Sequence, residues 1–225
     1  MNLITKWIPA QKSSSSKTGI KIRRARELEV RFFKDLESRM NFEDEKRRSE
    51  IHVSDLVYCL KKAYFRKKGI KENHDPKELA VKSIGKGHHH IYETLKGAFR
   101  ELEVRRYGVV GHIDLFEDCP IEIKTTRRKL KEIGKIPEHY LRQVAYYCIL
   151  TQKTRAFLVY VYVVKPEIKI YELDYSPCLE GYSKEFHFRL NLLRRALKED
   201  RPGILAESNF KWECRYCSFK EVCLK

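Results

Sequence analysis

The sequence predicts an α/β fold in which a mixed sheet forms the core and helices flank it. Segments rich in β-forming residues occur as two successive pairs, Val104–Phe116 with Ile121–Thr125 and Ala156–Val164 with Ile168–Tyr175. Segments with helical spacing of apolar residues precede, separate and follow these pairs. Because the chain has 225 residues, we expect one substantial core with appendages rather than two independent domains.

The N-terminal part of the chain is predicted to be helical after a flexible start. The first 20 residues include four consecutive serines, a composition typical of flexible linkers. An amphipathic helix is predicted over residues 22–47, since apolar residues recur there at intervals of four. A second helix is predicted over Asp55–Lys68, with Ser54 as its N-cap and Gly69 after its last residue.

The later elements follow from the same patterns. A helix is predicted from Glu78 to about Glu101, and the turn Glu117–Pro120 joins the first two strands into a hairpin. Helical spacing returns over Glu138–Leu150, and a long helix then carries one apolar stripe: Leu179, Tyr182, Phe186, Leu190, Leu193 and Leu197. The chain is therefore divided into a flexible N-terminus (1–20), an N-terminal helical region (21–75), a core (76–202) and a C-terminal cysteine-rich region (203–225).

The charge balance indicates the class of partner. The formal net charge is +16 and the isoelectric point is near 9.5, so nucleic acid is the leading partner and an anionic membrane surface the alternative. No apolar run is long enough to span a bilayer, and Met1–Gln11 lacks the apolar core of a signal peptide. We therefore expect a soluble cytoplasmic protein with no membrane partner.

Four of the seven cysteines have the pattern of a metal site. Cys214, Cys217 and Cys223 form C-x2-C-x5-C near the C-terminus, and Cys59 lies far upstream. In a reducing compartment, such cysteines are expected to be metal ligands rather than disulfide partners. Four thiolates complete one centre, and zinc and iron–sulfur clusters both accept such a set. Either centre would join the predicted second helix to the C-terminal region.

The first hairpin places two carboxylates together. A register centred on Asp118 puts Asp114 opposite Glu122, with Cβ atoms roughly 5 Å apart. Lys124 shares their face because side chains on a strand alternate, whereas Ile123 points into the core and offers its carbonyl oxygen as a ligand. Opposed carboxylates favour a hard divalent ion, Mg²⁺ or Mn²⁺, between them. The alternative is an exposed acidic pair with a surface salt bridge.

These residues also match a known family. The pattern G-x-x-D at Gly111 to Asp114, followed by E-x-K at Glu122 to Lys124, resembles the core of the PD-(D/E)xK nucleases in their RecB-like branch. The resemblance implies a restriction-endonuclease-like mixed sheet and a metal-dependent nuclease. It also implies that Asp114, Glu122 and Lys124 are catalytic and that Mn²⁺ or Mg²⁺ is the cofactor.

Two further motifs of that branch are present. G-x-x-x-H-x-x-x-E fits Gly85, His89 and Glu93, although neighbouring histidines allow a shift by one position. The resemblance makes His89 a catalytic residue and a metal ligand, and an imidazole among oxygen ligands favours Mn²⁺. Q-x-x-x-Y fits Gln143 and Tyr147, which lie one helical turn apart and would contact a nucleotide near the metal. The resemblance assigns these two residues to the catalytic site as well.

Iron–sulfur members of the branch place one cysteine before the core and C-x2-C-x5-C after it. Cys59, Cys214, Cys217 and Cys223 match in number, order and spacing, which implies a 4Fe-4S cluster clasping the C-terminal region to the N-terminal helices. Among these members the chain looks most like the CRISPR-associated exonucleases, the fourth of the numbered Cas families. That resemblance implies single-stranded DNA as substrate, 5′ to 3′ polarity, prespacer trimming and CRISPR integrase proteins as partners.

Basic residues follow the E-x-K strand. Arg127 and Arg128 are candidates for DNA-backbone contacts because they lie beside the proposed phosphate-cleaving centre, although most such runs are simply solvated. Two alternatives remain open. One is a non-catalytic nucleic-acid-binding protein with zinc or a redox-sensing cluster, and the other is a RecB-like repair nuclease outside CRISPR. The residues leave the oligomeric state undecided.

Overall fold

The architecture is taken from a computed structural model of the chain. It describes residues 49–73, 80, 83–85, 99–127, 136–164, 167–206, 208 and 210–223, together with positions 14, 15, 21, 22, 27, 30, 31, 34 and 35. The strands of the main sheet are β3 (Ile51–His52), β4 (Phe99–Arg106), β5 (Val109–Phe116), β6 (Pro120–Thr126), β7 (Arg155–Tyr162) and β8 (Glu167–Asp174). The helices are α3 (Val53–Val57), α4 (Leu60–Lys67), α6 (Glu138–Thr151), α7 (Leu179–Glu199), the 3-10 helix η2 (Pro202–Ile204), α8 (Lys211–Arg215) and α9 (Lys220–Cys223).

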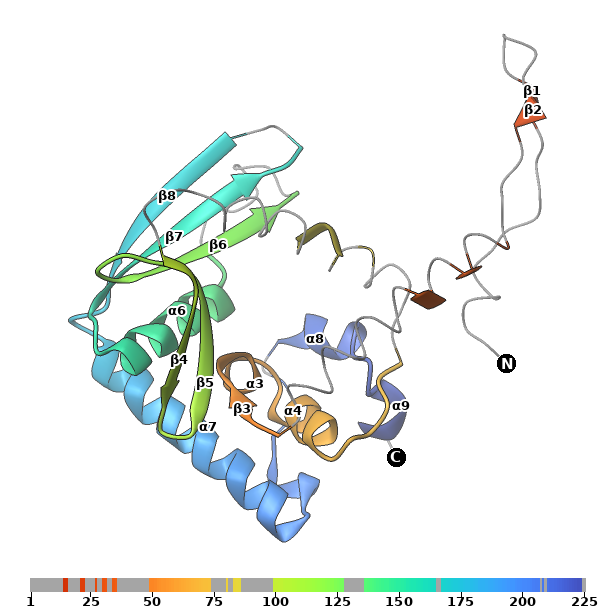
Figure 1. Cartoon of the computed structure of the whole chain (residues 1–225). Helices are drawn as coiled ribbons and strands as arrows, with labels where there is room; N and C mark the ends of the chain where they lie inside the picture. Colours follow the sequence, from red (N-terminus) through yellow and green to blue (C-terminus); the bar gives the residue numbers. More distant parts are fainter. Residues whose placement is uncertain are drawn as a thin grey trace.

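The sheet is mixed, and β5 is its branching strand (Figure 1). One edge of β5 pairs with β4 along its whole length, antiparallel. Its other edge pairs with β3 at Val109 and Val110 and with β6 only at Leu115 and Phe116. Beyond β6, the order continues to β7, parallel, and β8, antiparallel. The middle of β5 therefore has one edge without a neighbouring strand among the described residues, and Asp114 lies there.

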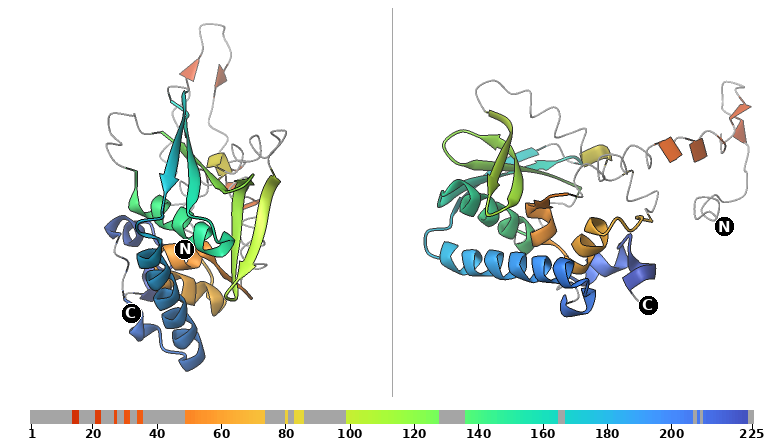
Figure 2. Two further views of the ribbon diagram at one scale, coloured as in Figure 1. Left: turned by 90° about the vertical axis from the view of Figure 1, so that its left-hand side faces the viewer. Right: turned by 60° about the horizontal axis from the view of Figure 1, so that its bottom comes forward.

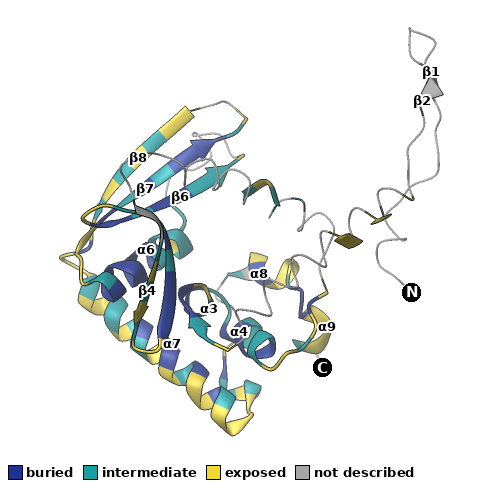
Figure 3. Cartoon of the chain, viewed as in Figure 1, coloured by how far each residue is buried: buried dark blue, intermediate teal, exposed yellow. Residues whose placement is uncertain are grey.

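Helix α6 crosses one face of the sheet and connects the parallel strands β6 and β7. Its apolar residues Val144, Ala145 and Cys148 pack on Leu158 and Tyr160 of β7. Helix α7 packs on the outer side of α6, so both views in Figure 2 show α6 between the sheet and α7. Buried residues concentrate on β5 and α6, whereas α7 alternates buried and exposed positions (Figure 3).

The mixed α/β class is confirmed. Helices α6 and α7 and the β7–β8 pair are also confirmed, with bounds within about one residue of the prediction. The exception is the end of β7, which lies two residues before the predicted Val164. The prediction of one strand over Val104–Phe116 is wrong, because the chain turns at Tyr107 and Gly108. Both residues have positive φ, 56° and 69°, which is the geometry of a tight hairpin turn. The predicted helix ending near Glu101 is also wrong there, since residues 99–101 belong to β4.

The predicted helix Asp55–Lys68 is two short helices that meet at Tyr58 and Cys59. The carbonyls before this corner are bound from outside: Arg189 of α7 donates to Leu56 and Tyr58, and Arg142 of α6 donates to Val57. The N-cap is His52 rather than Ser54, and the Asp55 carboxylate accepts the His52 N–H at 2.9 Å. Cys59 is consequently the N-cap of α4 instead of lying inside a longer helix.

Much of the N-terminal prediction falls outside the described residues. Ser14–Ser15 (β1) and Lys21–Ile22 (β2) form a two-residue antiparallel pair, so Ile22 is not yet helical. Residues 27, 30, 31, 34 and 35 are helical, in agreement with the predicted helix. No helix in the described part of the chain is long and apolar enough to cross a membrane.

Candidate active site and cysteine cavity

Asp114 lies where β5 and β6 separate. The pairs Leu115 with Ile121 and Phe116 with Pro120 have the predicted register, but the ladder ends one pair before Asp114 and Glu122. Instead, Asp114 Oδ2 accepts the backbone N–H of Ile123 at 2.7 Å. The carboxylate thus bridges the fork between the strands and lies beside the E-x-K segment.

Glu122 is the centre of a hydrogen-bonded group with Lys124, Gln143 and Tyr147, and Asp114 adjoins it through the Ile123 N–H. We call these five residues the catalytic group, after the role that the sequence predicts for them. Glu122 is only 2% exposed, and its Oε1 accepts from the ammonium of Lys124 and, at 2.8 Å, from Gln143 Nε2. Gln143 Oε1 accepts from Lys124 at 3.0 Å, and Gln143 Nε2 lies 2.9 Å from the hydroxyl of Tyr147. The predicted residues of β6 and α6 are therefore in direct contact.

Burial and charge act in opposite directions on Lys124. Burial disfavours its ammonium, but the charge of Glu122, with smaller contributions from Tyr58 and Asp114, raises its pKa above the usual value. Burial also raises the pKa of Tyr147, and the Glu122 carboxylate adds to that shift. Lys124 is thus a cation that compensates a buried carboxylate, and Tyr147 is a neutral phenol.

A glycine lets α6 approach β5 closely enough to place Tyr147. A Cβ built on Gly111 would lie 2.9 Å from Leu150 Cδ1 and 3.3 Å from Tyr147 Cδ1. A larger residue would force the buried side chains of Leu150 and Tyr147 to shift. The glycine of the G-x-x-D pattern therefore has a packing role beside Asp114.

Tyr58 is a site residue that the sequence did not reveal. Burial raises its pKa to about 12, and the opposing charge of Lys124 is the next largest influence. Its side chain thus lies within electrostatic reach of the catalytic group. Its neighbour Cys59 faces a separate cavity. The one feature of the sequence that could have pointed to Tyr58 is its position next to Cys59.

The four predicted cluster cysteines line one cavity of about 130 Å³, which we call the cysteine cavity. Cys59 comes from the start of α4, Cys214 from α8, and Cys217 and Cys223 from the turn before α9 and its end. All four are unbonded thiols, and burial raises the pKa of Cys59 and Cys217. The other lining residues are Lys61, Lys62, Phe65, Ser208, Glu213, Phe219 and Lys220.

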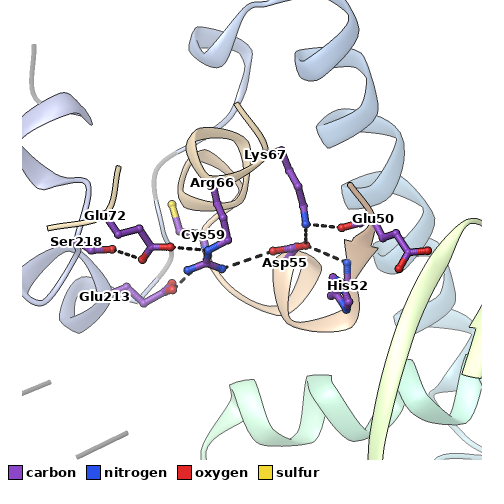
Figure 4. A network of polar contacts seen from close by, with 9 residues as sticks. All are labelled: Glu50, His52, Asp55, Cys59, Arg66, Lys67, Glu72, Glu213 and Ser218. Atoms are coloured by element: carbon purple, nitrogen blue, oxygen red, sulfur yellow. Dashed lines mark hydrogen bonds and ion pairs between the residues drawn. The ribbon is translucent and has the colours of Figure 1, made fainter. Parts of the chain in front are cut away.

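Polar contacts join α4 to the C-terminal helices around this cavity (Figure 4). The backbone N–H of Cys59 donates to Glu213 Oε1 at 3.2 Å, and Ser218 donates to Glu72 Oε2 at 2.7 Å. Arg66 donates to the other oxygen of Glu72 at 2.7 Å. Glu213 and Ser218 adjoin cysteines of the C-x2-C-x5-C motif, which is the signal that could have singled them out.

The donor sets differ between the two places. Two carboxylates and a backbone carbonyl suit a hard divalent cation, whereas four thiols beside three lysines suit an anionic thiolate-bound centre. Within the described residues, no three His, Cys, Asp or Glu side chains are close enough together to hold one metal ion. His89 and Arg128 lie outside the described residues, and Arg127 is exposed after β6.

Comparisons with known proteins agree with this arrangement. The family model of the PD-(D/E)XK nuclease superfamily matches residues 34–224. The chain is 26% identical over 197 residues to the CRISPR-associated exonuclease Cas4 of Saccharolobus solfataricus, covering 79% of this chain and 89% of that protein.

Solved structures share the fold. The crystal structure of SSO0001 is similar with a TM-score of 0.53 and 23% identity, over 82% of this chain and 95% of that one. The alkaline exonuclease LHK-Exo from Laribacter hongkongensis is similar with a TM-score of 0.50 and 14% identity, over 70% of this chain and 94% of that one.

Proposed function

Because the chain belongs to the PD-(D/E)XK nuclease superfamily, we propose that it is a metal-dependent exonuclease that cleaves single-stranded DNA from 5′ to 3′. The observation that carries the proposal is the catalytic group itself. A carboxylate only 2% exposed is held by Lys124 and Gln143 next to a second carboxylate at the fork of β5 and β6. A surface salt bridge does not require such burial or an amide from another element.

The residues of the catalytic group have separate roles in this proposal. Asp114, Glu122, the carbonyl of Ile123 and His89 would hold Mn²⁺ or Mg²⁺. When bound, the ion supplies a water of lowered pKa and neutralises charge on the phosphate. Lys124 orients the attacking water and stabilises the negative charge that develops on the phosphate.

The remaining site residues are assigned to DNA binding. Gln143 and Tyr147 hold the nucleotide at the scissile phosphate, since an amide and a neutral phenol both donate hydrogen bonds to oxygen. Arg127 and Arg128 are assigned to the DNA backbone, in keeping with a net charge of +16.

The cysteine cavity is proposed to hold a 4Fe-4S cluster. Four thiols around one cavity support this, as do three lysines that would balance the negative charge of a thiolate-bound cluster. The four thiolates that bind a 4Fe-4S cluster lie farther apart than four thiolates that bind a single metal ion. The cavity between the cysteines accords with the wider spacing. Protein purified without oxygen should absorb near 400 nm and contain about four irons per chain. Stoichiometric zinc would contradict the assignment.

The biological role is proposed from the relatives. The 26% identity to a CRISPR-associated exonuclease supports a role in trimming prespacers in the cytoplasm, with CRISPR integrase proteins as partners. A RecB-like repair nuclease outside CRISPR would have the same catalytic group. Copurification with an integrase encoded nearby would distinguish the two roles.

Cleavage of end-labelled single-stranded DNA in Mn²⁺, Mg²⁺ or EDTA tests the activity, and 5′ and 3′ labels report polarity. Asp114→Ala and Glu122→Ala should abolish cleavage while DNA affinity stays within a few-fold, because phosphate contacts elsewhere dominate affinity. Asp118→Ala is the control, since Asp118 lies in the same hairpin but is exposed and paired with Arg155. Binding without metal-dependent cleavage by the wild type would favour the non-catalytic alternative.

A further inference from the structure

Ring side chains fill the space between the catalytic group and the last helices of the chain. Tyr58 comes from the α3–α4 corner, His139 and Tyr140 from α6, and Phe210 and Trp212 from the start of α8. None of the five is fully buried, and Trp212 is 46% exposed. We call these five residues the aromatic platform.

The rings of the platform form a continuous chain of contacts. The centroid of His139 lies 4.3 Å from that of Tyr140, 5.8 Å from Tyr58 and 5.3 Å from Trp212. Phe210 and Trp212 are stacked, 6.1 Å apart with their planes at 24°. The separations from 5.3 to 6.1 Å fall within the range of favourable aromatic pairs, and the 4.3 Å contact between the adjacent residues His139 and Tyr140 is closer than that range.

One end of the platform is at the catalytic group. The ammonium of Lys124 lies 5.1 Å from the centroid of the Tyr140 ring, and Tyr58 is within electrostatic reach of Lys124 and Glu122. The other end is the exposed Trp212. Tyr58, Phe210 and Arg142 also line a cavity of about 170 Å³ that reaches Arg189 of α7, and the Arg142 guanidinium lies 5.4 Å from the Phe210 centroid.

Packing alone does not account for this arrangement. Rings that only fastened α8 to α6 would be stabilised by complete burial, yet Trp212 leaves nearly half of its surface in water. Aromatic faces next to cations, in a chain of net charge +16, are what unpaired bases on a phosphate backbone require. Bases within a duplex are already stacked and cannot present their faces.

We propose that the aromatic platform is a stacking surface for the unpaired bases of a DNA strand whose scissile phosphate reaches the catalytic group. This inference rests on the proposed nuclease function and adds where the strand lies: bases stack on Trp212 and its neighbouring rings, and the backbone passes Lys124. The platform would thereby select single-stranded over double-stranded DNA near the site of cleavage.

Fluorescence tests the stacking directly, because Trp7 and Trp212 are the two tryptophans of the chain. In the Trp7→Phe variant, all tryptophan emission comes from Trp212. Titration with oligothymidylate in EDTA should quench that emission along the same curve that anisotropy of a labelled oligonucleotide gives for binding. A blunt duplex of equal length should bind without equal quenching. Single-strand binding that leaves the emission unchanged would overturn the proposal.

Substitution at Trp212 provides the energetic test. Trp212→Ala should weaken single-strand binding about tenfold or more and duplex binding less than twofold, whereas Trp212→Phe should stay within about threefold of wild type. Tyr107→Asn is the matched control, since Tyr107 is 44% exposed in the β4–β5 turn, on the other side of α3 from α8 (Figure 1), and Asn tolerates its positive φ. Equal losses for single strand and duplex would contradict the proposal.

The outcomes separate this inference from the nuclease assignment. Quenching by single strands without any cleavage in Mn²⁺ or Mg²⁺ would retain the platform and reject the nuclease. Cleavage of single strands without quenching would reject the platform and retain the nuclease. Melting temperatures of all variants show whether a loss of affinity reflects unfolding, and the Trp7→Phe titration does not depend on any change at Trp212.

Discussion

The catalytic group and the cysteine cavity are held together in different ways. Asp114 and Ile123 are nine positions apart, and Glu122 and Gln143 are 21 apart, so a hairpin and one βα unit assemble the catalytic group. The contacts at the cavity join residues 154 and 146 positions apart, through hydrogen bonds from Cys59 and Ser218, and Phe219 packs on Phe65 beside them. We expect the catalytic group to depend on the sheet and the cysteine cavity to depend more on whatever the thiols bind, because closing a longer loop costs more entropy.

The largest expected effect separates turnover from stability. If Lys124 acts as proposed, Lys124→Met should lower cleavage about 100-fold or more in Mn²⁺, because it removes a fixed charge at the reacting phosphate. Calorimetry should still detect Mn²⁺ binding, and iron content should be unchanged. Lys169→Met on β8, where Lys169 forms only a surface ion pair with Glu167, is the control. Loss of iron in Lys124→Met would show that the two regions are not independent.

The second prediction addresses the cysteine cavity. If the cysteine cavity holds the proposed cluster, Cys59→Ala should release it and lower the melting temperature by about 10 °C, because binding of a metal centre contributes to folding. Cys178→Ala should change neither property, since Cys178 is exposed and lies before α7, outside the cavity. Full iron and an unchanged melting temperature in Cys59→Ala would mean that another residue is the fourth ligand.

A third prediction concerns the packing beneath the catalytic group. Gly111→Ala should cost about 2 kcal/mol of unfolding free energy, because the added methyl would lie 2.9 Å from Leu150 Cδ1. Cleavage should fall more than DNA binding, since Tyr147 must move as well. Leu150→Ala in the same chain should relieve the clash and recover part of the activity. If turnover is unaltered in Gly111→Ala, the position of Tyr147 does not affect catalysis.

The smallest effect is expected at the contact between α4 and the C-terminal helices. Ser218→Ala should cost about 1.5 kcal/mol, because it removes a buried hydrogen bond to the carboxylate of Glu72. Ser176→Ala serves as the comparison, since its hydroxyl bonds an exposed Asp174 and should contribute little. Denaturant titration measures both. An equal, negligible cost for the two would indicate that the hydrogen bond from Ser218 to Glu72 does not stabilise the contact between these segments.

The sequence by itself determined the features that depend on neighbouring residues. Alternation along β6 placed Glu122 and Lys124 on one face, and helical spacing placed Gln143 and Tyr147 one turn apart on α6. The structure has both relationships. The apolar stripe of α7 was likewise a local pattern, because strand and helix geometry fix which residues share a face.

Only the tertiary structure decided the features that depend on distant segments. The helix break at Tyr58 and Cys59 follows from Arg189, more than 130 positions away, which binds carbonyls that helical spacing would assign to one continuous helix. The β5–β6 ladder likewise ends before Asp114, and β5 pairs instead with β3 at Val109 and Val110, a segment nearly 60 positions upstream that no local pattern places there. The contact between Trp212 of α8 and His139 of α6 has no local signal, because side chains meet across elements only after the chain has packed.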